Sequence, residues 1–333
     1  MLESVRKIKS QVFPLFSPSV RNIIEQLPQD IVTKMEEIRL RHEKPLSIHW
    51  SGGEAFLNCK GELALAKDSY FPDKEDLQKT IELISGYSLY AHEEEVRQGY
   101  LTVPGGHRVG LAGKAVMEGK NIKCIRDISS LNFRIARQVK GAGEKILPFL
   151  IDRRRGCVLH SLIISPPQAG KTTLLRDLAR LISTGGGVLG LSGQKVGIID
   201  ERSEIAGCFQ GMPQLDIGER SDVLDACPKA EGIMLMLRAL SPQVLITDEI
   251  GNEQDVNAVK EAVYCGVTVI TSAHGSNLEE ICNRPILGKL IQGNYFERLI
   301  FLSSSKGPGT LEIILEGERG LPLYTPRGGG SND

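Results

Sequence analysis

The sequence predicts an α/β protein, with an N-terminal mixed α/β domain followed by a C-terminal domain whose sheet is mainly parallel. A chain of 333 residues is too long for one small domain and fits two packed domains. The first part alternates short strand-like and helix-like segments with glycine turns. From about residue 157, apolar runs of strand length alternate with longer helical patterns. This alternation is typical of βαβ units and of a parallel sheet that is covered on both faces.

These patterns divide the chain into four segments. Residues 1–140 form the N-terminal domain, where a helix is expected from Lys74 to Leu89 and a hairpin around the Pro104-Gly105-Gly106 turn. Residues 141–156 form a linker. Residues 157–305 form the C-terminal domain, with strands expected at 157–165, 196–199, 244–247, 267–272 and 299–303. Residues 306–333 hold an edge strand at 310–315 and a flexible tail at 328–333.

Composition and charge narrow the function classes. Hydrophobic residues make up 41% of the chain and charged residues 24%, as in a soluble globular protein with a sizeable core. The formal net charge of −1 gives no overall attraction to nucleic acid. The apolar runs are far shorter than the roughly 20 residues that cross a bilayer, and the N-terminal residues lack the pattern of a signal peptide. Seven scattered cysteines without a CxxC pair predict reduced thiols rather than disulfides or a zinc site.

A phosphate-binding loop is predicted between an apolar strand and an amphipathic helix. It comprises Ser165, Pro166, Pro167, Gln168, Ala169, Gly170, Lys171, Thr172 and Thr173. Backbone N–H groups of such a loop cradle phosphate oxygens, Lys171 reaches the outer phosphates, and the Thr172 hydroxyl coordinates Mg²⁺. Ser165 stands where the general pattern has its first glycine, and two prolines stiffen the loop. The C-terminal domain is therefore predicted to be a RecA-like P-loop NTPase domain.

A second motif follows about seventy residues downstream. The apolar segment Pro242–Thr247 ends in the acidic pair Asp248 and Glu249. In a P-loop NTPase such a pair supplies a magnesium-shell carboxylate and a group that orients the attacking water. We expect Asp248 to serve the metal and Glu249 the water. An acidic pair at a strand end is otherwise often only a helix cap.

Two further strand ends carry polar residues that are expected at the same edge of the sheet. Asp200 and Glu201 follow one strand, and His274 follows another. Asp200 and Glu201 fit a functional site or an N-cap equally well. His274 fits a hydrogen bond to the γ-phosphate or a packed, capping histidine equally well.

Arginine side chains are the third kind of candidate, because a guanidinium can stabilise the charge that spreads over the γ-phosphate during transfer. A single arginine is more often a surface or structural residue. The candidates are Arg126, Arg134, Arg137, Arg202, Arg220 and Arg238.

These motifs, with Leu237–Leu240 before the acidic strand and Ser272–Gly275 closing the next, resemble the ATPases of type II and type IV secretion and pilus machines. In that superfamily the segment at Asp200–Glu204 corresponds to an Asp box and His274 to a His box. The sequence is still more similar to the stage III sporulation AA family, over roughly residues 20–320. The stretches that carry this similarity are Ser88–Glu95, Pro104–Gly113, Arg134–Arg137, Ser165–Pro167, Asp200–Glu204 and Asp225–Gly232.

The resemblance implies a motor that binds ATP and Mg²⁺ and forms a homo-oligomeric ring, expected as a hexamer. Nucleotide would lie between the N-terminal and C-terminal domains, with Arg126, Arg134 and Arg137 as the arginines expected to reach it. The protein would be cytoplasmic and peripheral at the inner face of the membrane, on the mother-cell side. Its partners would be integral membrane components of a sporulation channel, with no nucleic acid expected. Secretion ATPases usually have glycine where this chain has Asp248, which predicts a more ordinary magnesium site here.

The leading hypothesis is ATP hydrolysis by in-line attack of water on the γ-phosphate. Lys171 and Thr172 would bind phosphate and Mg²⁺, Glu249 would position water, and Glu201 and His274 would respond to the nucleotide state. Two other classes stay open. One is a P-loop ATPase that is coupled to nucleic acid, against which the near-neutral charge weighs. The other is a scaffold that assembles on binding nucleotide and turns over little.

Overall fold

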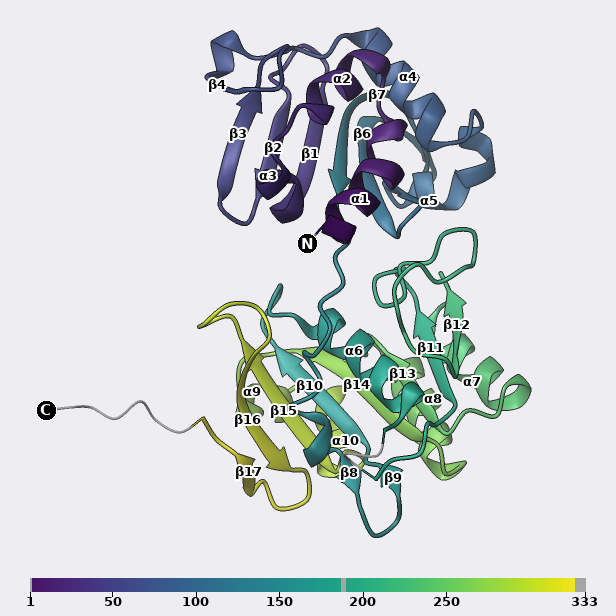
Figure 1. Ribbon diagram of the computed structural model, residues 1–333. Coiled ribbons are helices and arrows are strands. Elements are labelled where there is room, and N and C mark those ends of the chain that lie inside the picture. The colour runs from purple at the N-terminus through teal and green to yellow at the C-terminus, as the bar shows by residue number, and fades with distance from the viewer. Residues whose placement is uncertain (1, 187–189, 327–333) are drawn as a thin grey trace, which may run out of the picture. The chain divides into compact units, whose positions relative to one another are not determined.

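The protein is described by a computed structural model that covers residues 2–186 and 190–326 (Figure 1). The chain divides into two compact units, Met1–Arg137 and Gln138–Asp333. In the described residues, no helix has the length and apolar character that crossing a membrane requires. The tail predicted at 328–333 lies outside the described residues.

The first unit is a seven-stranded antiparallel sheet with helices packed on it. The strand order among the described residues is β4-β3-β2-β1-β7-β6-β5. The strands are β1 Met35–Arg41, β2 Ser47–Trp50, β3 Gly53–Leu57, β4 Leu63–Ala64, β5 Tyr100–Val103, β6 His107–Glu118 and β7 Asn121–Arg134. The helices are α1 Leu2–Gln11, η1 Phe13–Leu15, α2 Pro18–Glu25, α3 Gln29–Lys34, η2 Ala66–Asp68, α4 Lys74–Ile84, η3 Leu89–His92 and α5 Glu93–Arg97.

Local sequence signals account for several of these elements. Asp73 accepts a hydrogen bond from the Asp76 N–H while Asp76 reaches back to Asp73, a capping box that starts α4. Gly105 and Gly106 have φ of 84° and 72°, and they make the tight turn that joins β5 to β6. The helix and the hairpin expected from the sequence are thus both present. The helix ends at Ile84, five residues earlier than expected.

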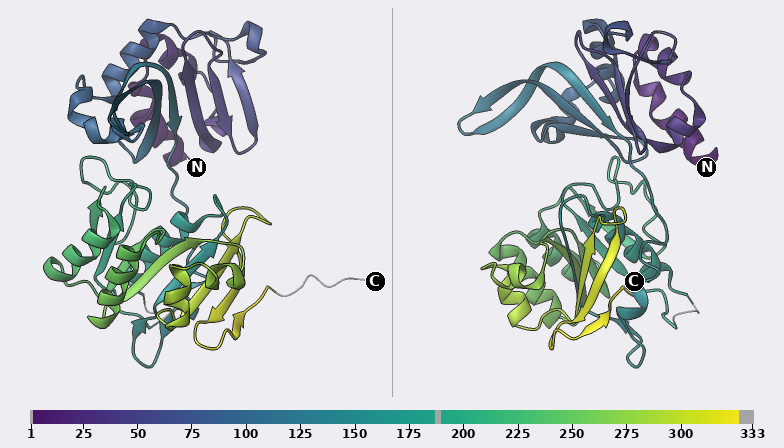
Figure 2. Two further views of the ribbon diagram at one scale, coloured as in Figure 1. Left: turned by 180° about the vertical axis from the view of Figure 1, so that it is seen from behind. Right: turned by 90° about the vertical axis from the view of Figure 1, so that its left-hand side faces the viewer.

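One hydrophobic core holds the first unit together. Alternate residues of neighbouring strands, such as Leu40 on β1 and Leu131 on β7, are fully buried. Phe16, beside η1, stacks on Phe133 with ring centroids 4.0 Å apart. The distal half of the β6–β7 hairpin projects away from this core (Figure 2), where Met117 and Ile122 are exposed.

The second unit is built on an eight-stranded, mainly parallel sheet, as the sequence predicts. Its order among the described residues is β12-β11-β13-β14-β10-β15-β16-β17. Pairing is parallel from β12 to β15 and antiparallel for β16 and β17. The strands, with a separate β8–β9 pair, are β8 Ile151–Asp152, β9 Cys157–Val158, β10 Ser161–Ser165, β11 Val196–Asp200, β12 Ser221–Asp225, β13 Val244–Thr247, β14 Thr268–His274, β15 Arg298–Ser303, β16 Thr310–Glu316 and β17 Pro322–Tyr324. The helices are η4 Leu147–Phe149, α6 Lys171–Thr184, α7 Lys229–Ala239, α8 Glu253–Tyr264, α9 Leu278–Cys282 and α10 Leu287–Gln292.

Helices cover both faces of this sheet, so its central strands are apolar on both sides. On β10, Ile163 packs with Leu175 and Leu178 of α6 in one core. Its neighbours Leu162 and Ile164 face the opposite way, into a core shared with α7, α8 and α10. This two-sided burial explains the continuous apolar runs of the sequence.

Three segments differ from the sequence expectation. Residues 141–156, expected as a linker, pack within the second unit because Ile146, Leu147 and Leu150 bury their side chains in the core beside α6. The strand at 310–316 is not the edge of the sheet, since β17 pairs with its outer side. The apolar run at 157–165 is divided into the short strand β9 and the central strand β10.

Candidate nucleotide-binding site

The predicted site residues gather at the carboxyl edge of the parallel strands. The central strands β10, β11, β13 and β14 end at Ser165, Asp200, Thr247 and His274, and Ser165 is paired in register with His274. A cavity of about 590 Å³ opens at this edge. Its lining includes eleven predicted residues: Pro167, Gln168, Gly170, Lys171, Thr172, Thr173, Glu201, Arg202, Asp248, Glu249 and His274.

The loop before α6 has a backbone that few sequences tolerate. Gln168 has φ of +60° and Gly170 has φ of +89°. A Cβ on Gly170 would lie 2.9 Å from the Gly309 nitrogen, because the 307–309 turn lies against the loop and Gly309 N–H donates to the Ala169 carbonyl at 2.9 Å. Ser165 has no positive φ, so serine is accommodated where the general pattern has glycine. Ser165 and Ala169 are almost fully buried.

Lys171, the first residue of α6, is half-buried at the base of the cavity. Its ammonium donates to the carbonyls of Ser165 and Pro166 at 3.2 and 3.3 Å. It also lies 2.9 Å from Nδ1 of His274. Burial lowers the pKa of Lys171, and the nearby Glu249 opposes that shift.

His274 connects Lys171 to Glu249. A lysine ammonium can only donate, so Nδ1 of His274 accepts from Lys171 and the ring proton lies on Nε2. Nε2 in turn lies 3.0 Å from Oε2 of Glu249. The predicted phosphate-binding lysine and the predicted water-orienting glutamate are therefore joined through one imidazole.

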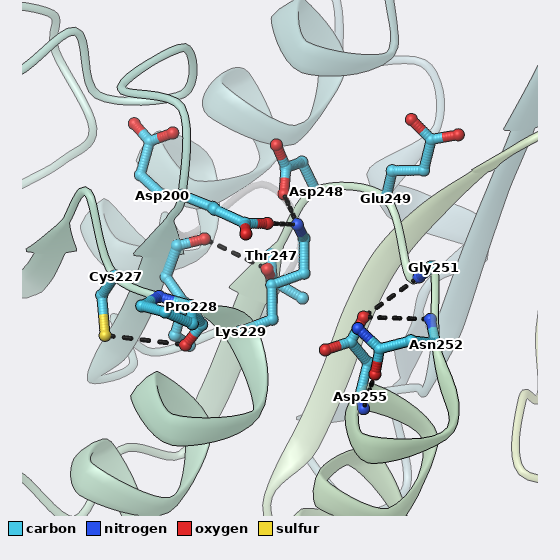
Figure 3. Close-up of polar contacts among 12 residues, drawn as sticks. Asp200, Cys227, Pro228, Lys229, Thr247, Asp248, Glu249, Gly251, Asn252 and Asp255 are labelled. Atoms are coloured by element: carbon cyan, nitrogen blue, oxygen red, sulfur yellow. Dashed lines mark hydrogen bonds and ion pairs between the residues drawn. The ribbon is translucent and has the colours of Figure 1, made fainter. Parts of the chain in front are cut away.

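A second cluster surrounds Lys229, the first residue of α7, whose importance the sequence analysis missed. Its ammonium forms ion pairs with Glu201 and, at 3.1 Å, with Oδ1 of Asp248 (Figure 3). Among the described residues Oδ1 of Asp248 is buried without a well-aligned hydrogen bond. Burial raises the pKa of Asp248 against the opposing charge of Lys229. For Lys229, burial lowers the pKa, but Glu201 and Asp248 outweigh it and the net pKa is raised.

Asp200 has a structural role that neither sequence interpretation anticipated. Its carboxylate is fully buried and accepts backbone N–H bonds of 2.8 to 2.9 Å from Glu204, Ile205 and Ala206. It therefore closes the loop after β11 rather than capping a helix. Burial raises its pKa to about 6, and the three hydrogen bonds oppose that shift. The loop in turn presents Glu201 and Arg202 to the cavity.

The arginines predicted to reach the nucleotide lie in the first unit. The guanidinium of Arg137 donates three hydrogen bonds to the carbonyls of Thr33 and Met35. Arg134 is mostly exposed and lies 3.7 Å from Glu37. Arg134 and Arg137 are therefore engaged within their own unit, and Arg126 lies on β7 of that unit. The catalytic role of all three stays a prediction.

The cavity also includes residues for which the sequence analysis assigned no role. Asn252 caps α8 through the Asp255 N–H, and Asp255 accepts from the N–H groups of Gly251 and Asn252 (Figure 3). A capping box of this kind is visible in sequence as Asn followed three residues later by an acid. By contrast, no local sequence pattern predicts that Lys229, on a helix, pairs with acids that follow two different strands.

Comparison with known proteins identifies the family. The profile of the family described as "Sporulation stage III, protein AA" matches residues 6–323. Stage III sporulation protein AA of Bacillus subtilis is 45% identical over 307 residues, which cover 92% of this chain and 95% of that protein. The fold resembles the pilus retraction motor PilT solved with bound ADP, with a TM-score of 0.55, 14% identity and coverage of 87% and 77% of the two chains. The Legionella pneumophila ATPase DotB aligns with a TM-score of 0.50 and 15% identity, covering 80% and 72%.

The two likenesses to solved structures concern the fold alone, since their sequence identity is low. The family profile spans nearly the whole chain, and the Bacillus protein is similar over almost its full length. This chain therefore belongs to the sporulation stage III, protein AA family.

Proposed function

We propose that the protein is a Mg²⁺-dependent ATPase and acts as a motor resembling secretion ATPases. The observation that carries the proposal is the single cavity in which the loop of Gly170 and Lys171 faces Asp248 and Glu249. The chain supplies a strand, the phosphate-binding loop and a helix, and later a strand that ends in acidic residues. P-loop proteins that transfer phosphoryl groups have these elements in the same order.

The loop and the start of α6 are the proposed phosphate-binding elements. α6 spans 14 residues, and its first residues, Lys171, Thr172 and Thr173, line the cavity. The start of a helix carries the positive end of its dipole and unpaired backbone N–H groups, which favour phosphate. Gly170 N-caps this helix without a side chain, so phosphate oxygens can approach the backbone closely. Lys171 would exchange its present carbonyl acceptors for the outer phosphates, which carry more negative charge.

The metal side of the proposed site is formed by Thr172 and Asp248. Both line the cavity, and the buried Oδ1 of Asp248 lacks a well-aligned hydrogen bond. No group of three carboxylate, histidine or cysteine side chains that could cage an ion occurs in residues 2–186 and 190–326. That suits Mg²⁺, which binds through one or two protein oxygens and keeps several waters. Bound Mg²⁺ would neutralise charge that develops on the phosphate oxygens.

Glu249 is proposed to orient the attacking water. Its carboxylate is about one third exposed, and its Oε2 lies 3.0 Å from Nε2 of His274. When Lys171 moves to the phosphates, His274 loses its hydrogen-bond donor at Nδ1 and is able to turn. The Glu249 carboxylate can then accept a proton from water, so His274 would transmit nucleotide state. Glu201 would respond through its pairing with Lys229.

The assembly is proposed from family membership and from the resemblance to secretion motors. The protein would form a homo-oligomeric ring, expected as a hexamer, in which Arg134 or Arg137 reaches nucleotide. It would work with integral membrane components of a channel between mother cell and forespore, at the cytoplasmic membrane face on the mother-cell side. ATP is the proposed nucleotide, because the fold is shared with the ADP-bound motor PilT.

A second candidate is a nucleotide-gated scaffold with little turnover. Two contacts favour it: the hydrogen bonds that hold Lys171 on its own loop and the close approach of His274 to Glu249. Lys171 and Glu249 must both be released from these contacts before chemistry. Steady-state ATPase and ring assembly of wild type and Glu249→Gln distinguish the two candidates. A motor loses at least about tenfold in turnover but still assembles with ATP. Equal turnover in the two proteins would remove Glu249 from catalysis. Assembly without measurable turnover in the wild type would favour the scaffold.

A further inference from the structure

Lys229 lies beside Asp248, the proposed metal ligand. Its side chain is only 7% exposed, and its ammonium contacts Glu201 and Asp248, which follow the neighbouring strands β11 and β13. Buried lysines are rare unless they are paired. Here a single ammonium serves two carboxylates on the wall of one cavity.

The surrounding structure holds this arrangement in place. α7 begins at Lys229 and is anchored by Ile233 and Met236, which are fully buried. The backbone carbonyl of Asp248 accepts a 2.9 Å hydrogen bond from the Thr271 hydroxyl, which fixes the end of β13. The lysine therefore reaches the two carboxylates from a rigid helix start, and the carboxylates project from fixed strand ends.

The ammonium of Lys229 reduces the negative charge that Glu201 and Asp248 offer to a metal ion. Without its ammonium, Glu201 and Asp248 would present two negative oxygen donors to one cavity, a donor set that attracts divalent cations. With the ammonium in place, the two carboxylates and Lys229 together carry a net charge of −1, and Oδ1 of Asp248 is already in an ion pair. A metal ion must displace the ammonium or bring further negative ligands, and nucleotide phosphates are such ligands.

We propose that Lys229 is an internal counter-cation and positioning residue that makes divalent-metal binding at Asp248 depend on bound nucleotide. The proposal rests on the proposed function, in which Asp248 serves the metal. It predicts that the nucleotide-free protein binds Mn²⁺ weakly and that removing the ammonium creates a Mn²⁺ site that needs no nucleotide.

The test is a Mn²⁺ titration of nucleotide-free protein, followed by electron paramagnetic resonance, which reports free Mn²⁺ directly. We expect Lys229→Met to bind one Mn²⁺ at least about tenfold more tightly than wild type. Adding Asp248→Asn should abolish this gain. Lys289→Met is the matched control, because Lys289 pairs with Glu253 on the exposed surface and its loss creates no cavity site.

Three results would overturn the proposal: equal Mn²⁺ affinity in wild type and Lys229→Met, a gain that survives Asp248→Asn, or the same gain in Lys289→Met. If Lys229→Met does not fold, Glu201→Gln carries the test. The ammonium then pairs with Asp248 alone, so the Mn²⁺ concentration needed for half-maximal binding of a fluorescent ATP analogue should rise several-fold. No change would contradict the proposal.

Failure of the proposed function can be recognised separately. Wild type that does not bind the ATP analogue, or that binds it no better than Lys171→Ala, would contradict the nucleotide site. The Mn²⁺ titration without nucleotide still measures the effect of Lys229 in that case, because it does not depend on turnover.

Discussion

Replacing Gly170 with alanine should damage the phosphate-binding loop through two separate effects. Gly170 has φ of +89°, where an alanine costs roughly 1–2 kcal/mol. The added Cβ would also lie 2.9 Å from the nitrogen and 3.2 Å from the Cα of Gly309, both backbone atoms that cannot rotate away. Displacing that turn breaks the bond from Gly309 to the Ala169 carbonyl, worth about 1 kcal/mol.

Gly156→Ala provides a matched control in the same unit. Gly156 has φ of +63° but no atom within 4 Å of an added Cβ. It should show only the conformational cost of roughly 1–2 kcal/mol. Gly170→Ala should lose about 2–3 kcal/mol in total, and its affinity for an ATP analogue should fall at least about tenfold because the loop N–H groups move.

The assay combines urea unfolding with titration of a fluorescent ATP analogue. Circular dichroism follows both units, and fluorescence of Trp50, the one tryptophan in the sequence, reports the first unit separately. The reasoning would be refuted if the two alanine variants were equally stable and bound the analogue equally well. If Gly170→Ala is less stable but binds the ATP analogue as tightly as wild type, the loop backbone does not hold phosphate.

Three further substitutions test other parts of the structure. Leu150→Ala should lower the free energy of unfolding of the second unit by about 2–5 kcal/mol, measured by circular dichroism, because Leu150 is fully buried. A loss below about 0.5 kcal/mol, as for a surface residue, would contradict the packing of residues 141–156. Arg137→Ala should destabilise the first unit by about 2 kcal/mol, because the hydrogen bonds to the carbonyls of Thr33 and Met35 are lost. Urea unfolding followed by Trp50 fluorescence measures this, and an unchanged unfolding midpoint would favour a purely catalytic role. Burial lowers the pKa of His107 to about 4, below its ordinary 6.5, so stability that is present above pH 6.5 is lost as pH falls towards 4. Between pH 7 and 5 this loss of unfolding free energy is about 2 kcal/mol. His107→Gln should abolish this pH dependence of unfolding, followed by Trp50 fluorescence. Equal pH dependence in wild type and His107→Gln would exclude His107 as the cause.

Much of the second unit could be predicted because its signals are local. Strands such as Val196–Asp200 and Val244–Thr247 are buried on both faces and therefore read as continuous apolar runs. Parallel strands end at one edge, so residues after several strands could be placed together from the chain order alone. Lys171, Asp248 and His274 do line one cavity.

The remaining features depend on contacts between distant segments. The packing of Leu147 and Leu150 was missed because this short segment has neither helical nor strand periodicity. Lys229 acquires its partners only when α7 is placed across two strand ends. Asp200 was ambiguous because an acid after a strand looks alike whether it binds a ligand, caps a helix or closes a loop.

Phosphate release with Mg²⁺-ATP, measured for wild type and Lys171→Ala over a range of protein concentrations, tests the central claim most directly. The account predicts turnover that requires Lys171 and that rises per subunit as concentration increases, because shared sites form on assembly. Turnover that is equal in the two proteins would contradict an ATPase site at this loop.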